Sequence, residues 1–260
     1  LLAGAFFSAW GFQAGDNAVV ALLCGVAAGL VVAVLHANLS HRLTANQFVV
    51  GLTLNVLVVG LTAFLDAEMR PGQARAGVVE IPLLSDIPLV GTALFGQAWP
   101  GYLIYALIPM AWFLVFRTRW GLELRSVGEN PQSADVSGID VNRRRREGIY
   151  VAGITSGLGG AFLVLGQVGQ FQPNMSGGRG FIALAAVIFG GWTLRGAVAG
   201  CALFGLVEAF GLRVPSAGYG VNPQLLDSLP YVVALLVMVV FAHRVRPPTA
   251  LARPFIRGLK

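Results

Sequence analysis

The chain has 260 residues, of which 56% are hydrophobic and 12% charged. That is about half the charged fraction usual in a soluble domain, so the composition predicts a protein embedded in a lipid bilayer. Its formal net charge of +6 would suggest nucleic-acid binding in a soluble protein, but the positive-inside bias of membrane loops explains the excess of arginine, and we expect no nucleic-acid partner.

Eight apolar segments follow one another along the chain, and we expect each to be helical because a helix satisfies its own backbone groups in lipid. Strand-like alternation is absent, so a barrel is not expected. The sixth segment is too short to span alone unless it is a broken or re-entrant helix. The prediction is an all-α, polytopic transmembrane bundle over residues 1–260, with segments at Leu1–Phe12, Ala18–Leu35, Phe48–Leu65, Tyr102–Phe116, Gly148–Gly166, Phe181–Trp192, Ala197–Leu212 and Leu229–Phe241.

Several span residues are polar, and polar groups in a span usually face a bundle interior or a water-filled cavity. These candidates for a translocation path are Thr53, Asn55, Thr62, Thr155, Ser156 and Gln167. Asn55 is the best single candidate, and a hydrogen bond between helices is its alternative role. The densest run of glycines, Gly153–Gly160, predicts a helix that packs closely against another through small residues.

The connection 66–100 is long and too apolar for a solvated linker, so we expect an ordered extracytoplasmic loop with short helical or extended pieces, at which a partner could dock. Pro71, Pro82 and Pro88 interrupt it.

The polar segment 117–147 lies between two apolar runs and is rich in arginine. Placing it in the cytoplasm fixes every other loop by alternation and predicts a cytoplasmic carboxyl terminus. Four basic residues then lie outside: Arg70, Arg75, Arg179 and Arg213. Fourteen lie inside: Arg42, Arg117, Arg119, Arg125, Arg143, Arg144, Arg145, Arg146, Arg195, Arg244, Arg246, Arg253, Arg257 and Lys260. This asymmetry supports the orientation.

A short helix is predicted inside that segment, from Pro131 to Ser137. Asn130 would cap it, Pro131 suits the first turn, and Gly138 would end it. Seven residues have little helical stability alone, so the helix must pack against something. The arginines at 143–146 would anchor to lipid headgroups or bind a partner.

Aromatic and acidic residues near the later segments leave alternatives open. Phe181 and Phe189 could stack on a nucleobase or a sugar face, or pack in the core. Glu208 has no partner three or four residues away, so it would snorkel to the interface or contact a substrate hydroxyl.

Enzyme chemistry is not expected. Cys24 and Cys201 lie far apart in apolar runs, and His36, His41 and His243 fall at cytoplasmic ends. No group of these residues with acids has metal-ligand or catalytic spacing. Because Lys260 is the only lysine, the chain cannot contain a Gly-rich phosphate loop with its required lysine, so any ATP would bind another chain.

The central segment also resembles a known family. The pattern G-x-x-x-R-x-V-G-x-N-P-x-x-A-x-x-x-G-I is matched by Gly121, Arg125, Val127, Gly128, Asn130, Pro131, Ala134, Gly138 and Ile139. It resembles the cytoplasmic coupling segment of bacterial ABC-importer permeases of the branched-chain amino acid, simple-sugar and nucleoside superfamily. The stretches Ala45–Asn55 and Gly178–Trp192 agree, and together the three motifs are most similar to nucleoside-type permeases, some of them labelled simple-sugar permeases.

The resemblance implies a permease subunit of a bacterial inner-membrane importer, for nucleosides or alternatively for simple sugars or branched-chain amino acids. Its implied partners are a second permease subunit, two ATPase subunits that bind ATP and Mg²⁺, and an extracytoplasmic substrate-binding protein. No cofactor is expected in this chain. The implied ATPase-coupling residues are Arg125, Gly128, Glu129, Asn130, Pro131, Ala134, Asp135 and Gly138.

The resemblance also implies that Arg125 and Glu123 brace the short helix. Family members carry a further helix and an N-x-G-x-E-G-like stretch before the position of Leu1, so we expect the amino terminus to be truncated relative to them. A self-sufficient secondary transporter is less favoured, because the deep spans contain almost no acid for ion coupling.

Overall fold

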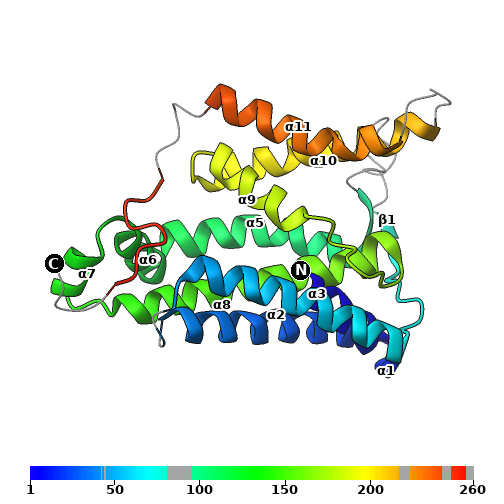
Figure 1. The fold of residues 1–260 in the computed structure, drawn as a ribbon, viewed down its shortest axis with the longest axis horizontal. Coiled ribbons are helices and arrows are strands. Elements are labelled where there is room, and N and C mark those ends of the chain that lie inside the picture. Colours follow the sequence, from blue (N-terminus) through cyan, green and yellow to red (C-terminus); the bar gives the residue numbers. More distant parts are fainter. Residues whose placement is uncertain (42, 44, 81–94, 217–222, 242–246, 256–260) are drawn as a thin grey trace. The chain divides into compact units, whose positions relative to one another are not determined.

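The computed structural model describes residues 1–260 except 42, 44, 81–94, 217–222, 242–246 and 256–260 (Figure 1). The predictions for Arg42, Pro82, Pro88, His243, Arg244, Arg246, Arg257 and Lys260 therefore lie outside the described residues. The chain divides into two compact units, Leu1–Ser176 with Ala252–Lys260, and Gly177–Leu251.

The first unit is built from long helices that run side by side (Figure 1). Its elements are α1 (Leu2–Gly15), α2 (Ala18–His41), α3 (Gln47–Met69), β1 (Val78–Glu80), β2 (Gly96–Ala98), α5 (Trp99–Arg117), α6 (Arg119–Glu129), α7 (Pro131–Val136), α8 (Val141–Phe162) and the π-helix η1 (Leu163–Val168).

Glycine sets the packing of α2 against α8. A Cβ added to Gly157 would lie 2.5 Å from the carbonyl oxygen of Gly25, and one added to Gly29 would lie 2.7 Å from the Cα of Gly157. The two backbones touch, which is how helices associate in lipid, where burial of apolar side chains gives no advantage. The predicted close packing of the 153–160 run is confirmed.

The connection between α3 and α5 contains extended pieces, as predicted. β1 pairs with β2 in antiparallel register, with Val78 opposite Ala98. Upstream of β1, Ala74 and Ala76 donate backbone hydrogen bonds to the carbonyls of Gly169 (2.8 Å) and Leu165 (2.9 Å), which ties this connection to the end of η1. The two short strands are a local departure from the predicted all-α fold.

The second unit contains three helices, α9 (Arg179–Phe189), α10 (Leu194–Ser216) and α11 (Pro223–Phe241), within the residues that are described. The predicted sixth segment corresponds to α9, whose 11 residues rise about 16 Å and cannot cross a bilayer alone. Tyr231 of α11 donates a hydrogen bond to the carbonyl of Gly177 (2.8 Å), which holds the entry to α9.

The all-α transmembrane architecture is confirmed, and each predicted apolar segment overlaps a helix. Within the described residues, five helices are long and apolar enough to cross a membrane: Ala18–His41, Gln47–Met69, Trp99–Arg117, Val141–Val168 and Leu194–Gly211. Arg179–Phe189 and Ser228–Val237 are shorter apolar helices.

Candidate functional site

The polar segment 117–147, which contains the predicted ATPase-coupling residues, lies at one end of the first unit, opposite the end that carries β1 (Figure 1). We call α6, α7, the first two turns of α8 and the tail Ala252–Phe255 together the α7 platform. Its parts are held together by a helix reversal, a charge network and a small apolar cluster.

The reversal occurs at Thr118, between α5 and α6. Its hydroxyl donates to the carbonyl of Leu114 (2.5 Å) and accepts from the amide of Gly121 (3.1 Å), so one side chain closes α5 and caps α6. A Cβ on Gly121 would meet the carbonyls of Leu114 and Val115. The first residue of the motif is therefore glycine because the chain turns tightly here.

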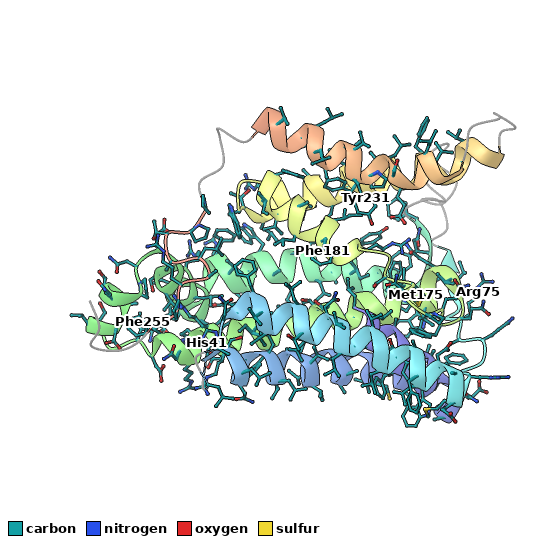
Figure 2. All side chains as sticks on the ribbon, in the orientation of Figure 1. His41, Arg75, Met175, Phe181, Tyr231 and Phe255 are labelled. Carbon is teal, nitrogen blue, oxygen red and sulfur yellow. The ribbon has the colours of Figure 1, made fainter. Side chains whose placement is uncertain are left out.

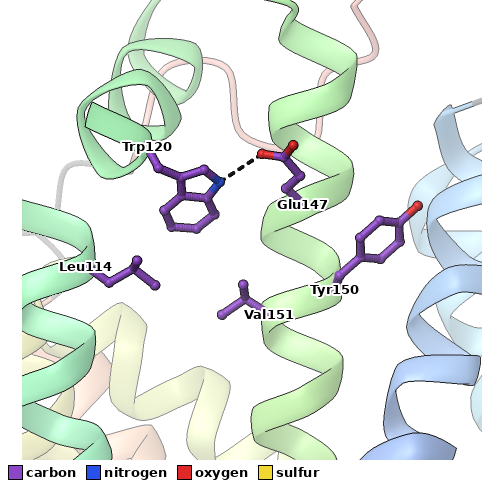
Figure 3. Close-up of a pocket in the computed structure, with 5 residues that line it drawn as sticks. All are labelled: Leu114, Trp120, Glu147, Tyr150 and Val151. Carbon is purple, nitrogen blue, oxygen red and sulfur yellow. Dashed lines mark hydrogen bonds between the residues drawn. The ribbon is translucent and has the colours of Figure 1, made fainter. Parts of the chain in front are cut away.

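The charge network joins α6 to α8. Arg144 contacts Glu123 at 2.5 Å and Glu147 at 2.6 Å, and the side chains are a quarter to a third exposed. The indole nitrogen of Trp120 donates to Glu147 at 2.8 Å (Figure 3). Arg143 pairs with the other oxygen of Glu147 at 2.9 Å but is 67% exposed, so its pair contributes little. Charge-assisted hydrogen bonds between these partly buried side chains hold α6 firmly against α8.

This network changes the reading of the arginines. Arg144 is engaged by two carboxylates of its own chain, whereas Arg143 stays largely exposed beside Glu147. Glu123 braces α6 against α8. Arg125 was expected to brace α7. It lies over the ring of Phe116 at 5.0 Å and donates to the carbonyl of Gly121 at 3.3 Å, so these contacts are with the end of α5 and the start of α6.

The short helix itself matches its prediction. The Asn130 side chain accepts from the amide of Ser133 at 3.0 Å, Pro131 occupies the first turn, and α7 ends at Val136, one residue before the predicted end. Gly138 has a φ of +84°, which glycine adopts without strain. The amide of Ile139 then donates to the carbonyl of Ala134 at 3.0 Å and closes the turn.

An apolar cluster supports the underside of α7. It joins Val127 of α6, Ala134 of α7 and Val141 of α8, with Ile139 and Phe255 packed against them. Ala134 is only 4% exposed. It was predicted on the contact face, but the structure places it at the base of the helix, because so short a helix needs an apolar anchor on one side.

The opposite face of α7 carries a residue that the motif did not indicate. Val136 is 90% exposed, the largest exposed fraction among the described large apolar residues. Position 136 lies about 200° around a helix from position 134. Because Ala134 is buried at the base of the helix, Val136 must point outward. The exposure of Val136 could therefore be predicted once the burial of Ala134 was known. Glu129 and Asn130 are also exposed, Pro131 and Asp135 partly so, and a Cβ on Gly128 would meet nothing within 4 Å.

A shallow cavity of about 350 Å³ lies beside the platform, where α5, α6 and α8 meet (Figure 3). Leu114, Trp120, Glu147, Tyr150 and Val151 line it. None of the predicted translocation residues belongs to this lining.

The polar path candidates of α3 and α8 divide by exposure. Thr53 is exposed but donates to the carbonyl of Val49 (2.9 Å), and Thr155 donates to that of Val151 (3.0 Å). Thr62 is 1% exposed. Asn55 is exposed, and among the described residues its side chain has no hydrogen-bond partner. A polar side chain within a span is stabilised by a hydrogen-bond partner or by water.

The remaining path candidates have different surroundings. Gln167 is exposed on η1. Phe181 is 61% exposed (Figure 2), whereas the ring of Phe189 packs on Phe204 at 6.1 Å between centroids. Thr53, Asn55 and Gln167 belong to the first unit, and Phe181, Phe189 and Glu208 to the second.

Glu208 has a partner that sequence spacing could not show. Its carboxylate pairs with the guanidinium of Arg179, 29 residues earlier, at the start of α9. Snorkelling alone therefore does not account for this acid.

Comparison with known proteins decides the family. The family described as branched-chain amino acid transport system / permease component matches residues 1–242. The chain belongs to this family. As a permease component with several membrane-crossing helices it is a multi-pass membrane protein.

Among characterised relatives, the nucleoside ABC transporter permease NupC of Lactococcus lactis is 36% identical over 89% of the chain and 75% of its own length. The guanosine ABC transporter permease NupQ of Bacillus subtilis is 33% identical over 92% and 78%. The fructose import permease FrcC of Rhizobium meliloti is 24% identical over 87% and 64%. No solved structure matches this permease.

Proposed function

We propose that this permease is a transmembrane subunit of an ATP-driven nucleoside importer in a bacterial cell membrane. It would form part of the translocation path and couple through α7 to a separate ATPase subunit. Two relatives that cover most of the chain are named for nucleoside or guanosine transport, whereas the fructose relative is less similar. Nucleosides are therefore favoured over fructose.

The exposed valine of α7 is the observation that carries the coupling role. A six-residue helix has little stability of its own and is kept here by a charge network and an apolar base. The helix held in this way presents Val136, which is 90% exposed, on its outer face. An apolar side chain on a fixed, otherwise polar projection is what a groove in a partner protein would recognise.

The orientation of the chain supports the same assignment. Arg145 donates to the carbonyl of Arg253 at 2.6 Å, so the tail lies beside α6 and α8 at the arginine-rich end. That end would be cytoplasmic by the positive-inside rule. ATP and Mg²⁺ would bind on the ATPase subunits, and a substrate-binding protein would deliver nucleoside at the opposite face.

The exposed polar positions of α3 suit a translocation path between subunits. Thr53 and Asn55 lie exposed on a helix that is long and apolar enough to span. In a pair of permeases this face would meet a second subunit or a water-filled path, which would satisfy the amide of Asn55.

The test combines uptake with ATPase binding. The complex with its ATPase and binding protein, in proteoliposomes, should import radiolabelled guanosine in preference to fructose. Val136→Asp should abolish co-purification of the ATPase, because a charge would enter an apolar groove. Val78→Asp is the matched control, since Val78 is 62% exposed at the other end of the first unit.

Full ATPase binding by Val136→Asp would reject α7 as the contact. Fructose uptake without guanosine uptake would instead assign the substrate to sugars and leave the coupling role standing.

A further inference from the structure

We propose that the tail Ala252–Phe255 positions α7 for its partner and that Phe255 is the positioning residue. This inference rests on the proposed coupling role of α7. It concerns a segment outside the sequence motif, more than a hundred residues downstream of α7 in the chain.

Phe255 completes the base of the α7 platform. It packs against the cluster of Val127, Ala134 and Val141 (Figure 2). These three residues come from three different helices, so a ring packed against their cluster helps to hold the helices together. α7 contributes only the methyl group of Ala134.

A polar contact fixes the same tail two residues earlier. The guanidinium of Arg145 donates to the backbone carbonyl of Arg253 at 2.6 Å. Val141 and Arg145 are four residues apart on α8, and such positions share one face of a helix. One face of α8 thus holds the tail through an apolar contact at Phe255 and a charge-assisted hydrogen bond at Arg253.

The apolar contact differs in kind from the caps at the two ends of the short helix. Asn130 caps its start and Gly138 its end, but both are local contacts that move with the helix. The small cluster joins it to α6, α8 and the tail. Removal of the ring would leave a gap beside Ala134 and would let α7 tilt or unwind.

The first measurement tests the docked tail without reference to ATPase. In a background with Cys24 and Cys201 replaced by serine, Phe255→Cys combined with Val127→Cys should be joined by the short thiol reagent dibromobimane in native membranes. Arg253→Cys combined with Gly72→Cys is the control, because the tail lies at the α7 end of the first unit and the connection from α3 to β1 at the other end (Figure 1). Failure of the first pair to react would overturn the proposal.

The second measurement tests positioning in the assembled importer. Phe255→Ala should weaken binding of the ATPase by about five- to thirtyfold, the factor that loss of a half-buried aromatic contact implies. It should also raise the number of ATP molecules hydrolysed per guanosine imported. Phe255→Leu should restore both values, since leucine fills most of the space. Leu251→Ala is the matched control, because Leu251 is 47% exposed.

A double substitution separates a specific role from a general loss of stability. If Arg145 and Phe255 act through the same docked tail, Arg145→Gln with Phe255→Ala should be no worse than the more damaging single change. Additive losses, or normal coupling in Phe255→Ala, would overturn positioning by the tail. If Val136→Asp also left ATPase binding intact, the proposed function itself would fail, which distinguishes the two results.

Discussion

At the scale of single residues, the contact of α2 with α8 leaves no room for one methyl group. A Cβ on Gly157 would lie 2.5 Å from the oxygen of Gly25 and 2.9 Å from the Cα of Val26. Both atoms belong to backbone, which cannot rotate away as a flexible side chain would. The helices would have to separate along their length, and every neighbouring contact would loosen.

We therefore predict that Gly157→Ala destabilises the protein by about 1–3 kcal/mol, the usual range for an overpacked core. Gly60→Ala on α3 is the control, because its Cβ would meet nothing within 4 Å. Thermal unfolding of the purified variants in detergent measures the difference. Equal midpoints for the two variants would show that the glycine contact does not set the packing.

Among the helices, α7 depends most on the residues that cap its two ends. Asn130 satisfies the amide of Ser133 at 3.0 Å, and Gly138 turns the chain out of the helix with a φ of +84°. In six residues the caps act on most of the backbone, so their share of the stability is larger than in a long helix. The cap is thus a structural role for a motif residue that the resemblance assigns to coupling.

Asn130→Ala should therefore destabilise α7 by about 1 kcal/mol, as loss of a capping side chain does. Asn130→Asp and Asn130→Ser should keep the helix, because both side chains cap well. Co-purification of the ATPase and the ratio of hydrolysis to uptake measure the effect. If all three variants lost binding equally, Asn130 would act through direct contact with the partner rather than as a cap.

At the scale of the whole molecule, the arginine-rich end of the first unit holds both α7 and the tail, while the β1–β2 pair lies at its other end (Figure 1). Fourteen basic residues were predicted on one side and four on the other from the sequence. The contact of Arg145 with Arg253 agrees with a tail on the side of α7.

Labelling of single cysteines tests this orientation. With Cys24 and Cys201 replaced, a membrane-impermeant maleimide should label Gly72→Cys in intact cells but not Val136→Cys or Arg253→Cys. The pattern should reverse in inside-out vesicles. Labelling of Arg253→Cys from outside would contradict the cytoplasmic carboxyl terminus.

Sequence reasoning succeeded where the signal is local. The apolar runs predicted the long apolar helices because a span must be apolar over its whole length, and Asn130, Pro131 and Gly138 predicted α7 because caps act within a few residues. The polar helix α6 was not predicted. Sequence reasoning failed where the partner is distant in the chain. The pair Arg179–Glu208 and the burial of Ala134 depend on which helices lie side by side.

The membrane environment, the apolar helices, the family motif and the charge asymmetry can be read from the amino-acid sequence, because they follow from composition and from neighbours within a few helical turns. The burial of Ala134, the exposure of Val136 and the packing of Phe255 at the base of α7 become visible in the folded chain. The physical reason is that a small apolar cluster is assembled from segments more than a hundred residues apart, and no period in the sequence records which of them will meet.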